Sequence, residues 1–71
     1  MIVVKNRLRE LRTDKKYTQI FVQVKTGIDQ SLLSKYELGE RIPTTENLII
    51  LSDFYNVSID YILYRSDKPN N

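Results

Sequence analysis

The chain has 71 residues, which is enough for one domain with a small hydrophobic core. It contains no Cys and no His, so thiol chemistry, the usual zinc sites and histidine acid–base catalysis are excluded. We therefore expect a binding protein and not an enzyme, with no metal and no cofactor. The absence of Cys also fits a reducing cytoplasm.

Charge is unevenly distributed along the chain. The formal net charge is only +2, but residues 1–18 hold six Lys or Arg against two Asp or Glu, whereas residues 42–71 hold two against four. This uneven charge is typical of a protein that turns one face toward an anion, and it fits a solvated basic helix equally well. No apolar run exceeds four residues, so we expect no signal peptide, no membrane span and a cytoplasmic protein.

The first predicted element is an amphipathic helix over about residues 4–15. Val4, Leu8 and Leu11 recur at spacings of four and three, with charged side chains between them. This is the period of a helix with one apolar face.

The segment 19–26 fits two structures. β-Branched residues alternate from Ile20 to Thr26, a pattern that by itself favours a strand. Thr18 as an N-cap, Gly27 in a helix-ending position and helical patterns on both sides favour a helix. We predict a helix, because a lone strand would have no partner.

Three further helices are predicted downstream, which makes the fold class all-α, a compact five-helix domain over residues 1–65. A polar tail over 66–71 has no reason to fold, and we expect it to be flexible. The remaining helices are expected over 30–37, capped by Asp29 and ended by Gly39; over 45–55, begun by Thr44 or Thr45 and ended by Asn56; and over 59–64, capped by Ser58.

The spacing around Gly27 indicates a helix-turn-helix. Two short helices are joined by a turn of about three to four residues that contains Gly. Such a turn exposes the polar side of the second helix, which has the width of the DNA major groove. An ordinary corner between two helices fits the spacing equally well. The polar residues that share this side by helical periodicity are Gln30, Ser31, Ser34 and Lys35, which would form a groove face or a solvated face.

An ordered set of residues over roughly 4–65 resembles the Cro/CI (XRE) helix-turn-helix family of phage and bacterial regulators. Its members are Arg12, Thr18, Gln19, Val22, Gly27, Ile28, Asp29, Leu33, Ser34, Lys35, Tyr36, Glu37, Gly39, Arg41, Pro43, Leu48, Leu51, Val57, Ser58, Asp60 and Tyr61. The chain departs from the family pattern at Gln23, Thr26, Leu38, Glu40 and Asn56. The Gln23 side chain stands where a small residue is usual, which predicts a wider separation of the second and third helices.

The resemblance implies a lambda-repressor-like fold and a transcriptional regulator, a repressor, that binds double-stranded DNA sequence-specifically with the helix over 30–37 in the major groove. Leu32 would meet a thymine methyl or simply cover the edge of the core. Base contacts are expected from Gln30, Ser31, Leu32, Ser34 and Lys35. Phosphate contacts are expected from Thr18, Gln19, Arg41, Thr44, Thr45 and Asn47, with Lys16 and Lys25 adding long-range attraction. The resemblance also implies a structural ion pair between Arg12 and Glu37.

A small bundle cannot bury all of its apolar side chains, and the resemblance implies that a homodimer covers some of them, at least on DNA. The operator would be pseudo-palindromic, with two recognition helices about 34 Å apart. Scattered surface aromatics would need no such explanation. The alternative function is a helical protein-interaction module, such as an antitoxin or anti-repressor; no small-molecule ligand is expected. The expected dimer contacts are Ile42, Ile59, Tyr61 and Tyr64.

Overall fold

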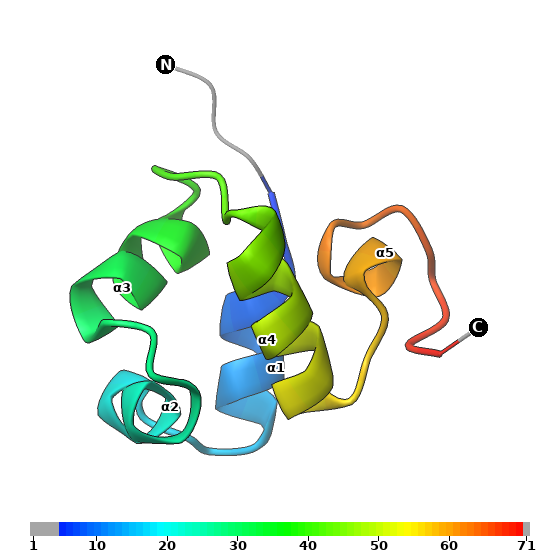
Figure 1. The fold of residues 1–71 in the computed structure, drawn as a ribbon. Coiled ribbons are helices and arrows are strands. Elements are labelled where there is room, and N and C mark those ends of the chain that lie inside the picture. The colour runs from blue at the N-terminus through cyan, green and yellow to red at the C-terminus, as the bar shows by residue number, and fades with distance from the viewer. Residues whose placement is uncertain (1–4, 71) are drawn as a thin grey trace.

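Five helices form the part of the chain that the structure, a computed structural model, describes, residues 5–70 (Figure 1). The helices α2 and α3 pack on each other at one end, α5 lies at the other, and α1 and α4 run between them. The predicted all-α fold is confirmed. None of the described helices has the length and apolar character needed to cross a membrane. The bounds are α1 (Leu8–Asp14), α2 (Gln19–Thr26), α3 (Gln30–Leu38), α4 (Thr45–Tyr55) and α5 (Ile59–Ile62).

Every helix contributes to one hydrophobic core. Each side chain buried there stabilises the fold by about 1.5–3 kcal/mol relative to its exposed state. Because these contacts link all five helices, the position of α3 depends on the whole domain. The buried apolar residues are Leu8, Val22, Ile28, Leu33, Tyr36, Leu51, Tyr55 and Ile62.

Side-chain caps begin α2, α3, α4 and α5. The capping side chains accept hydrogen bonds from backbone N–H groups in the first helical turn, which have no partner within the helix. Each such cap contributes about 1 kcal/mol. The caps predicted from the sequence are confirmed. They are Thr18, Asp29, Thr44 and Ser58, which accept from the N–H groups of Phe21, Ser31, Asn47 and Tyr61.

The ambiguous segment 19–26 is a helix, as predicted. Val22 is fully buried, so its apolar side chain anchors α2 to the core. Gly27 ends the helix with a φ of 79°, and its N–H donates to the Gln23 carbonyl. Burial and caps therefore outweigh the strand preference of the alternating β-branched residues.

The first and last helices are shorter than the sequence predicts. The helix α1 begins at Leu8 and not at residue 4, because the Asn6 side chain accepts from the Leu8 N–H at 3.0 Å. Val4 lies outside the described residues. The helix α5 ends at Ile62 instead of residue 64, since Tyr64 adopts a φ of 60° and turns the chain away.

An arginine clasp joins the start of α1 to α5. The Arg7 guanidinium lies 4.1 Å from the ring centroid of Tyr61 and 4.2 Å from that of Tyr64. Its Nε also donates to the Tyr61 carbonyl at 3.0 Å, and the Arg7 N–H donates to the Ile62 carbonyl at 2.8 Å. We call these contacts the Arg7 clasp.

The polar segment after the domain lies back against α5. The Ser58 N–H donates to the Pro69 carbonyl at 2.7 Å. The Arg7 guanidinium also reaches the Ser66 carbonyl at 3.4 Å and the Asp67 carboxylate at 3.9 Å. The polar composition of residues 66–71 predicts a flexible tail and gives no indication of these contacts. Residue 71 lies outside the described range.

Candidate nucleic-acid interface

The turn between α2 and α3 sets where α3 begins. Gly27 adopts the left-handed backbone conformation, with a φ of 79°. A Cβ at this position would meet nothing within 4 Å. Ile28 is buried directly after it, which ties the turn to the core. Glycine is therefore needed here for backbone conformation alone.

Gln23 connects α2 to α3 through a hydrogen bond, and the predicted wider separation of these helices stays a prediction. Its Oε1 accepts from the backbone N–H of Gln30 at 2.7 Å, so a side chain of α2 satisfies the first residue of α3. Sequence reasoning missed this role. The sequence indicates only that the first N–H groups of a helix lack helical partners, and it does not identify Gln23 as the acceptor.

The faces of α3 separate as the helical period predicts. Leu33 and Tyr36 are buried, whereas Ser31 and Lys35 are exposed and Ser34 is half-buried. Of the two interpretations of Leu32, the core contact is present, because this half-buried side chain packs against the core.

The cap at Asp29 also holds Ser31. Both the hydroxyl and the N–H of Ser31 donate to the Asp29 carboxylate, and these hydrogen bonds lower the pKa of Asp29. The Ser31 side chain is thus positioned at the exposed start of α3.

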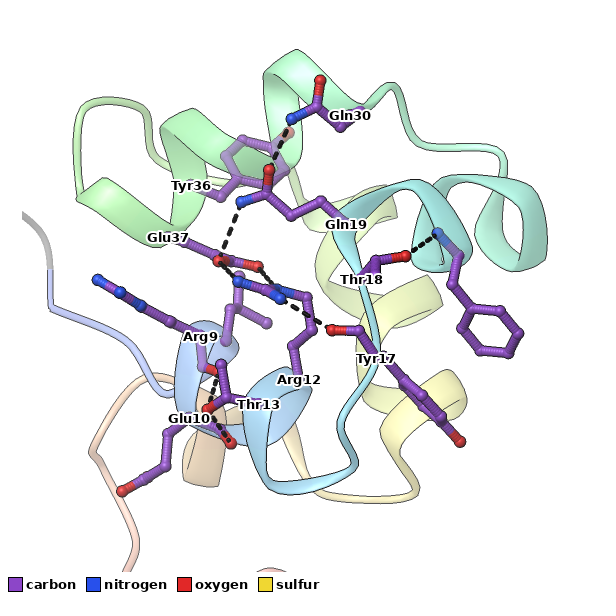
Figure 2. Close-up of polar contacts among 12 residues, drawn as sticks. Arg9, Glu10, Arg12, Thr13, Tyr17, Thr18, Gln19, Gln30, Tyr36 and Glu37 are labelled. Carbon is purple, nitrogen blue, oxygen red and sulfur yellow. Dashed lines mark hydrogen bonds and ion pairs between the residues drawn. The ribbon is translucent and has the colours of Figure 1, made fainter.

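Arg12 and Glu37 form a two-pronged ion pair between α1 and α3 (Figure 2). Arg12 Nε lies 2.8 Å from Glu37 Oε2, and Arg12 Nη2 lies 2.9 Å from Glu37 Oε1. Only 15% of the Arg12 side chain and 6% of the Glu37 side chain are exposed. The hydrogen bonds that Arg12 donates to Glu37 raise the pKa of Arg12, and Arg12 Nη1 also donates to the Tyr17 carbonyl at 2.8 Å.

Two glutamines extend this ion pair to the start of α3. Gln19 Nε2 donates to Glu37 Oε1 at 3.2 Å, and Gln30 Nε2 donates to Gln19 Oε1 at 2.6 Å. Figure 2 shows the resulting line of hydrogen bonds from Arg12 to Gln30. We call Glu37, Gln19 and Gln30 the amide chain. The family resemblance predicts a phosphate contact for Gln19, and nothing in the sequence indicates these hydrogen bonds.

The other residues expected near phosphates fall into two groups. Asn47 is half-buried, and its Nδ2 donates to the Tyr36 hydroxyl at 2.9 Å, so its amide already has a partner within the fold. The Thr18 and Thr44 hydroxyls accept as caps but remain exposed. Also exposed are Lys16, Lys25, Arg41 and Thr45.

A shallow cleft of about 230 Å³ lies between α1, α2 and α3. The exposed side chain of Arg9 lines this cleft together with residues of α3, and the sequence analysis did not select Arg9 as a site residue. The only available signal was the basic charge of the first 18 residues. The cleft is lined by Arg9, Arg12, Gln19, Ser34, Glu37 and Leu38.

The residues expected at a dimer interface differ in their surroundings. Ile42 is 68% exposed, in the loop before α4. Ile59 and Tyr61 are half-buried, and Tyr64 is exposed. The rings of Tyr61 and Tyr64 already contact Arg7 within the chain.

Known proteins resemble this chain over most of its length. YobD, an HTH-type transcriptional regulator of Bacillus subtilis, is 41% identical over 64 residues, which cover 90% of this chain and 57% of that protein. ImmR, an HTH-type transcriptional regulator of the same organism, is 43% identical over 61 residues, covering 86% and 48%. RstR, the cryptic phage CTXphi transcriptional repressor of Vibrio cholerae, is 37% identical over 62 residues, covering 87% and 55%.

The chain thus spans about half the length of these curated relatives, at 57%, 48% and 55%. A helix-turn-helix family model matches residues 8–62, from the first residue of α1 to the last of α5. This match covers all five helices and the turn at Gly27. The chain belongs to the Cro/CI (XRE) helix-turn-helix family.

Proposed function

We propose that this chain is a DNA-binding transcriptional regulator, a repressor, that inserts α3 into the major groove of double-stranded DNA. The observation that carries the proposal is the polar face of α3, exposed after a helix-turn-helix and held by caps, core contacts and the amide chain. Similarity to the repressor RstR supports the direction of regulation. The protein would act in the cytoplasm, where it would meet DNA.

The chemistry of the α3 face suits base edges. Lys35 can donate to guanine O6 and N7, Gln30 can pair with adenine, and Ser31, whose hydroxyl donates to Asp29, can accept. Gln19 stands at the first position of α2, where backbone N–H groups and the helix dipole favour a phosphate. The exposed cations Lys16, Lys25 and Arg41 would position the duplex without selecting sequence.

Two copies would bind together on a pseudo-palindromic operator. A net charge of +2 gives one copy little phosphate attraction, so a pair of recognition helices in successive grooves would supply the missing affinity. We place the contact between copies at Ile42, because its side chain is 68% exposed, with Ile59, Tyr61 and Tyr64 nearby in the family arrangement.

The proposal is tested by selecting bound sequences from a random duplex pool and then replacing Lys35. Lys35→Ala should reduce discrimination at one base pair by about 1–3 kcal/mol, because Lys35 donates to a base edge. Affinities for the selected duplex and for single-base variants, measured by fluorescence anisotropy, give this value. Lys68→Ala, an exposed lysine on the C-terminal segment, is the matched control.

Two results would contradict the proposal. Equal discrimination by the Lys35→Ala protein and the parent would remove Lys35 from the groove. Failure of the parent to retain any duplex at low salt would instead favour a protein-interaction module. The affinity for DNA should fall as the salt concentration rises, with a log–log slope of several units, because each neutralised phosphate releases counterions.

A further inference from the structure

The outer side of α2 carries apolar side chains that are exposed. Val22 anchors this helix in the core, and positions 20 and 24 lie about half a turn from it, on the opposite side. Ile20 is 56% exposed, Val24 is 72% exposed and Phe21 is 37% exposed. A single exposed apolar residue needs no explanation, but adjacent ones on a short helix mark an interaction surface. We call Ile20, Phe21 and Val24 the α2 patch.

Two lysines border the α2 patch. Lys25 Nζ lies 5.6 Å from the centroid of the Phe21 ring. On its other side the Phe21 ring lies 4.6 Å from the ring of Tyr17, which directly follows Lys16. Both lysines are exposed, and neither forms an ion pair within residues 5–70, where the ion pairs are made by arginines. An apolar patch with a basic border fits an apolar surface with an acidic border.

The chain itself offers such a surface on the outer side of α4. Leu51 is buried, and Ile49, about half a turn away, is 48% exposed. Glu46 and Asp53 stand about one turn before and one turn after Ile49, and both are exposed. Neither carboxylate forms an ion pair within residues 5–70. An apolar side chain thus lies between two acidic ones, and we call Glu46, Ile49 and Asp53 the α4 stripe.

Charge decides which surface of a second copy fits the α2 patch. Two α2 patches placed face to face would bring the lysines of both copies together, and like charges at a contact are unfavourable. The α4 stripe brings carboxylates instead. If the two helices run antiparallel, Lys25 in the last turn of α2 meets Glu46 in the first turn of α4. Lys16 then lies toward Asp53, so both ends of the contact carry opposite charges.

We propose that the α2 patch of one copy docks on the α4 stripe of a second copy. The contact is head-to-tail, so each copy keeps one of these surfaces free, and further copies can add in an open row. It uses none of the four expected dimer contacts, and α5 lies at the end of the domain away from α2 (Figure 1). The proposal goes beyond the proposed function and does not depend on it, because the contact involves no DNA.

Charge-reversed variants test the contact in the absence of DNA. Because the surface is small, the parent should associate weakly, with a dissociation constant of about 0.1–1 mM. Sedimentation equilibrium at several protein concentrations measures it, and should detect species larger than a dimer. Lys16→Glu/Lys25→Glu and Glu46→Lys/Asp53→Lys should each weaken the association by about tenfold, since attraction between the two surfaces becomes repulsion.

The fourfold variant, which combines these two pairs of changes, separates surface charge from net charge. It has the net charge of the parent, and its α2 and α4 surfaces again carry opposite signs, so it should associate as the parent does. Arg65→Glu/Lys68→Glu is the matched control. It changes the net charge as much as the α2 pair does, at exposed positions of the C-terminal segment, and should leave the association unchanged.

A variant in the apolar part of the patch keeps the test decisive if the fourfold variant does not fold. Val24→Gln changes a side chain that is 72% exposed, so the fold should be unaffected, as circular dichroism would verify. It should weaken the association by about threefold or more, because apolar contact area is lost. Leu38→Gln, at a residue of α3 that is 57% exposed, is the control and should have no effect.

Weaker association in both charge-reversed pairs and in Val24→Gln, with recovery in the fourfold variant, is the supporting result. A parent that stays monomeric at about 1 mM would overturn the proposal and leave the α2 patch to an acidic segment of a different protein. Association that stops at a dimer and is the same in all variants would overturn it too. Weakening by the α2 changes alone would exclude the α4 stripe as the occupant. None of these results bears on whether α3 binds DNA.

Discussion

Two groups share the carboxylate of Glu37. Arg12 binds both of its oxygens and ties α1 to α3, while Gln19 binds one of them. Desolvation largely offsets the attraction within a buried ion pair, so its principal effect is geometric. Removing one member nevertheless costs much more, because the other is left buried without a partner.

Replacement of Glu37 by alanine tests this point. Glu37→Ala should lower the free energy of unfolding by about 3 kcal/mol, since the largely buried Arg12 guanidinium would lose its carboxylate and keep only the Tyr17 carbonyl as a partner. Urea denaturation followed by circular dichroism measures the change. Glu40→Ala, at an exposed carboxylate, should stay within about 0.5 kcal/mol of the parent. An unchanged midpoint for Glu37→Ala would show that the pair does not hold α1 to α3.

Among the elements, the helices with side-chain caps follow most closely from sequence. Thr18, Asp29, Thr44 and Ser58 could be identified as caps because each lies directly before an apolar helical pattern. The start of α1 could not be predicted in this way, because the apolar period continues to Val4 while the Asn6 side chain interrupts it.

The contacts that long-range packing creates were beyond reach of local patterns. Gln23 meets the Gln30 N–H across a turn, Arg7 meets Tyr61 across most of the chain, and Ser58 meets Pro69 through backbone atoms. None of these partners is specified by periodicity or composition. The polar face of α3 was predictable, whereas the amide chain that orients its first residue required the relative placement of α2 and α3.

The turn between α2 and α3 gives a prediction at the same scale. Gly27→Ala should destabilise the domain by about 1–2 kcal/mol through backbone strain alone, because the added Cβ meets no neighbour. Gly27→Asn should cost less, since asparagine tolerates the left-handed region. Thermal or urea midpoints of the two variants measure the difference. Equal losses would point to a steric cause instead.

At the scale of the whole molecule, the Arg7 clasp joins both ends of the described chain. Arg7→Ala should reduce stability by about 1–2 kcal/mol, through two cation–π contacts and a hydrogen bond to a carbonyl. It should also speed hydrogen exchange at the Ser58 amide, which is bonded to Pro69. Arg65→Ala, at an exposed arginine, serves as the control. An unchanged Ser58 exchange rate would mean that the clasp does not hold the C-terminal segment.

The different anchoring of residues on α3 has an evolutionary consequence. Ser31 and Lys35 are exposed, so substitutions there can alter the preferred operator with little effect on folding. Gln30 is joined through Gln19 to the carboxylate that also binds Arg12, so replacement of Gln30 would remove a hydrogen bond between α2 and α3. If α3 enters the major groove as proposed, descendants of this protein would diverge in operator preference first at the base pairs facing Ser31 and Lys35, and last at the one facing Gln30.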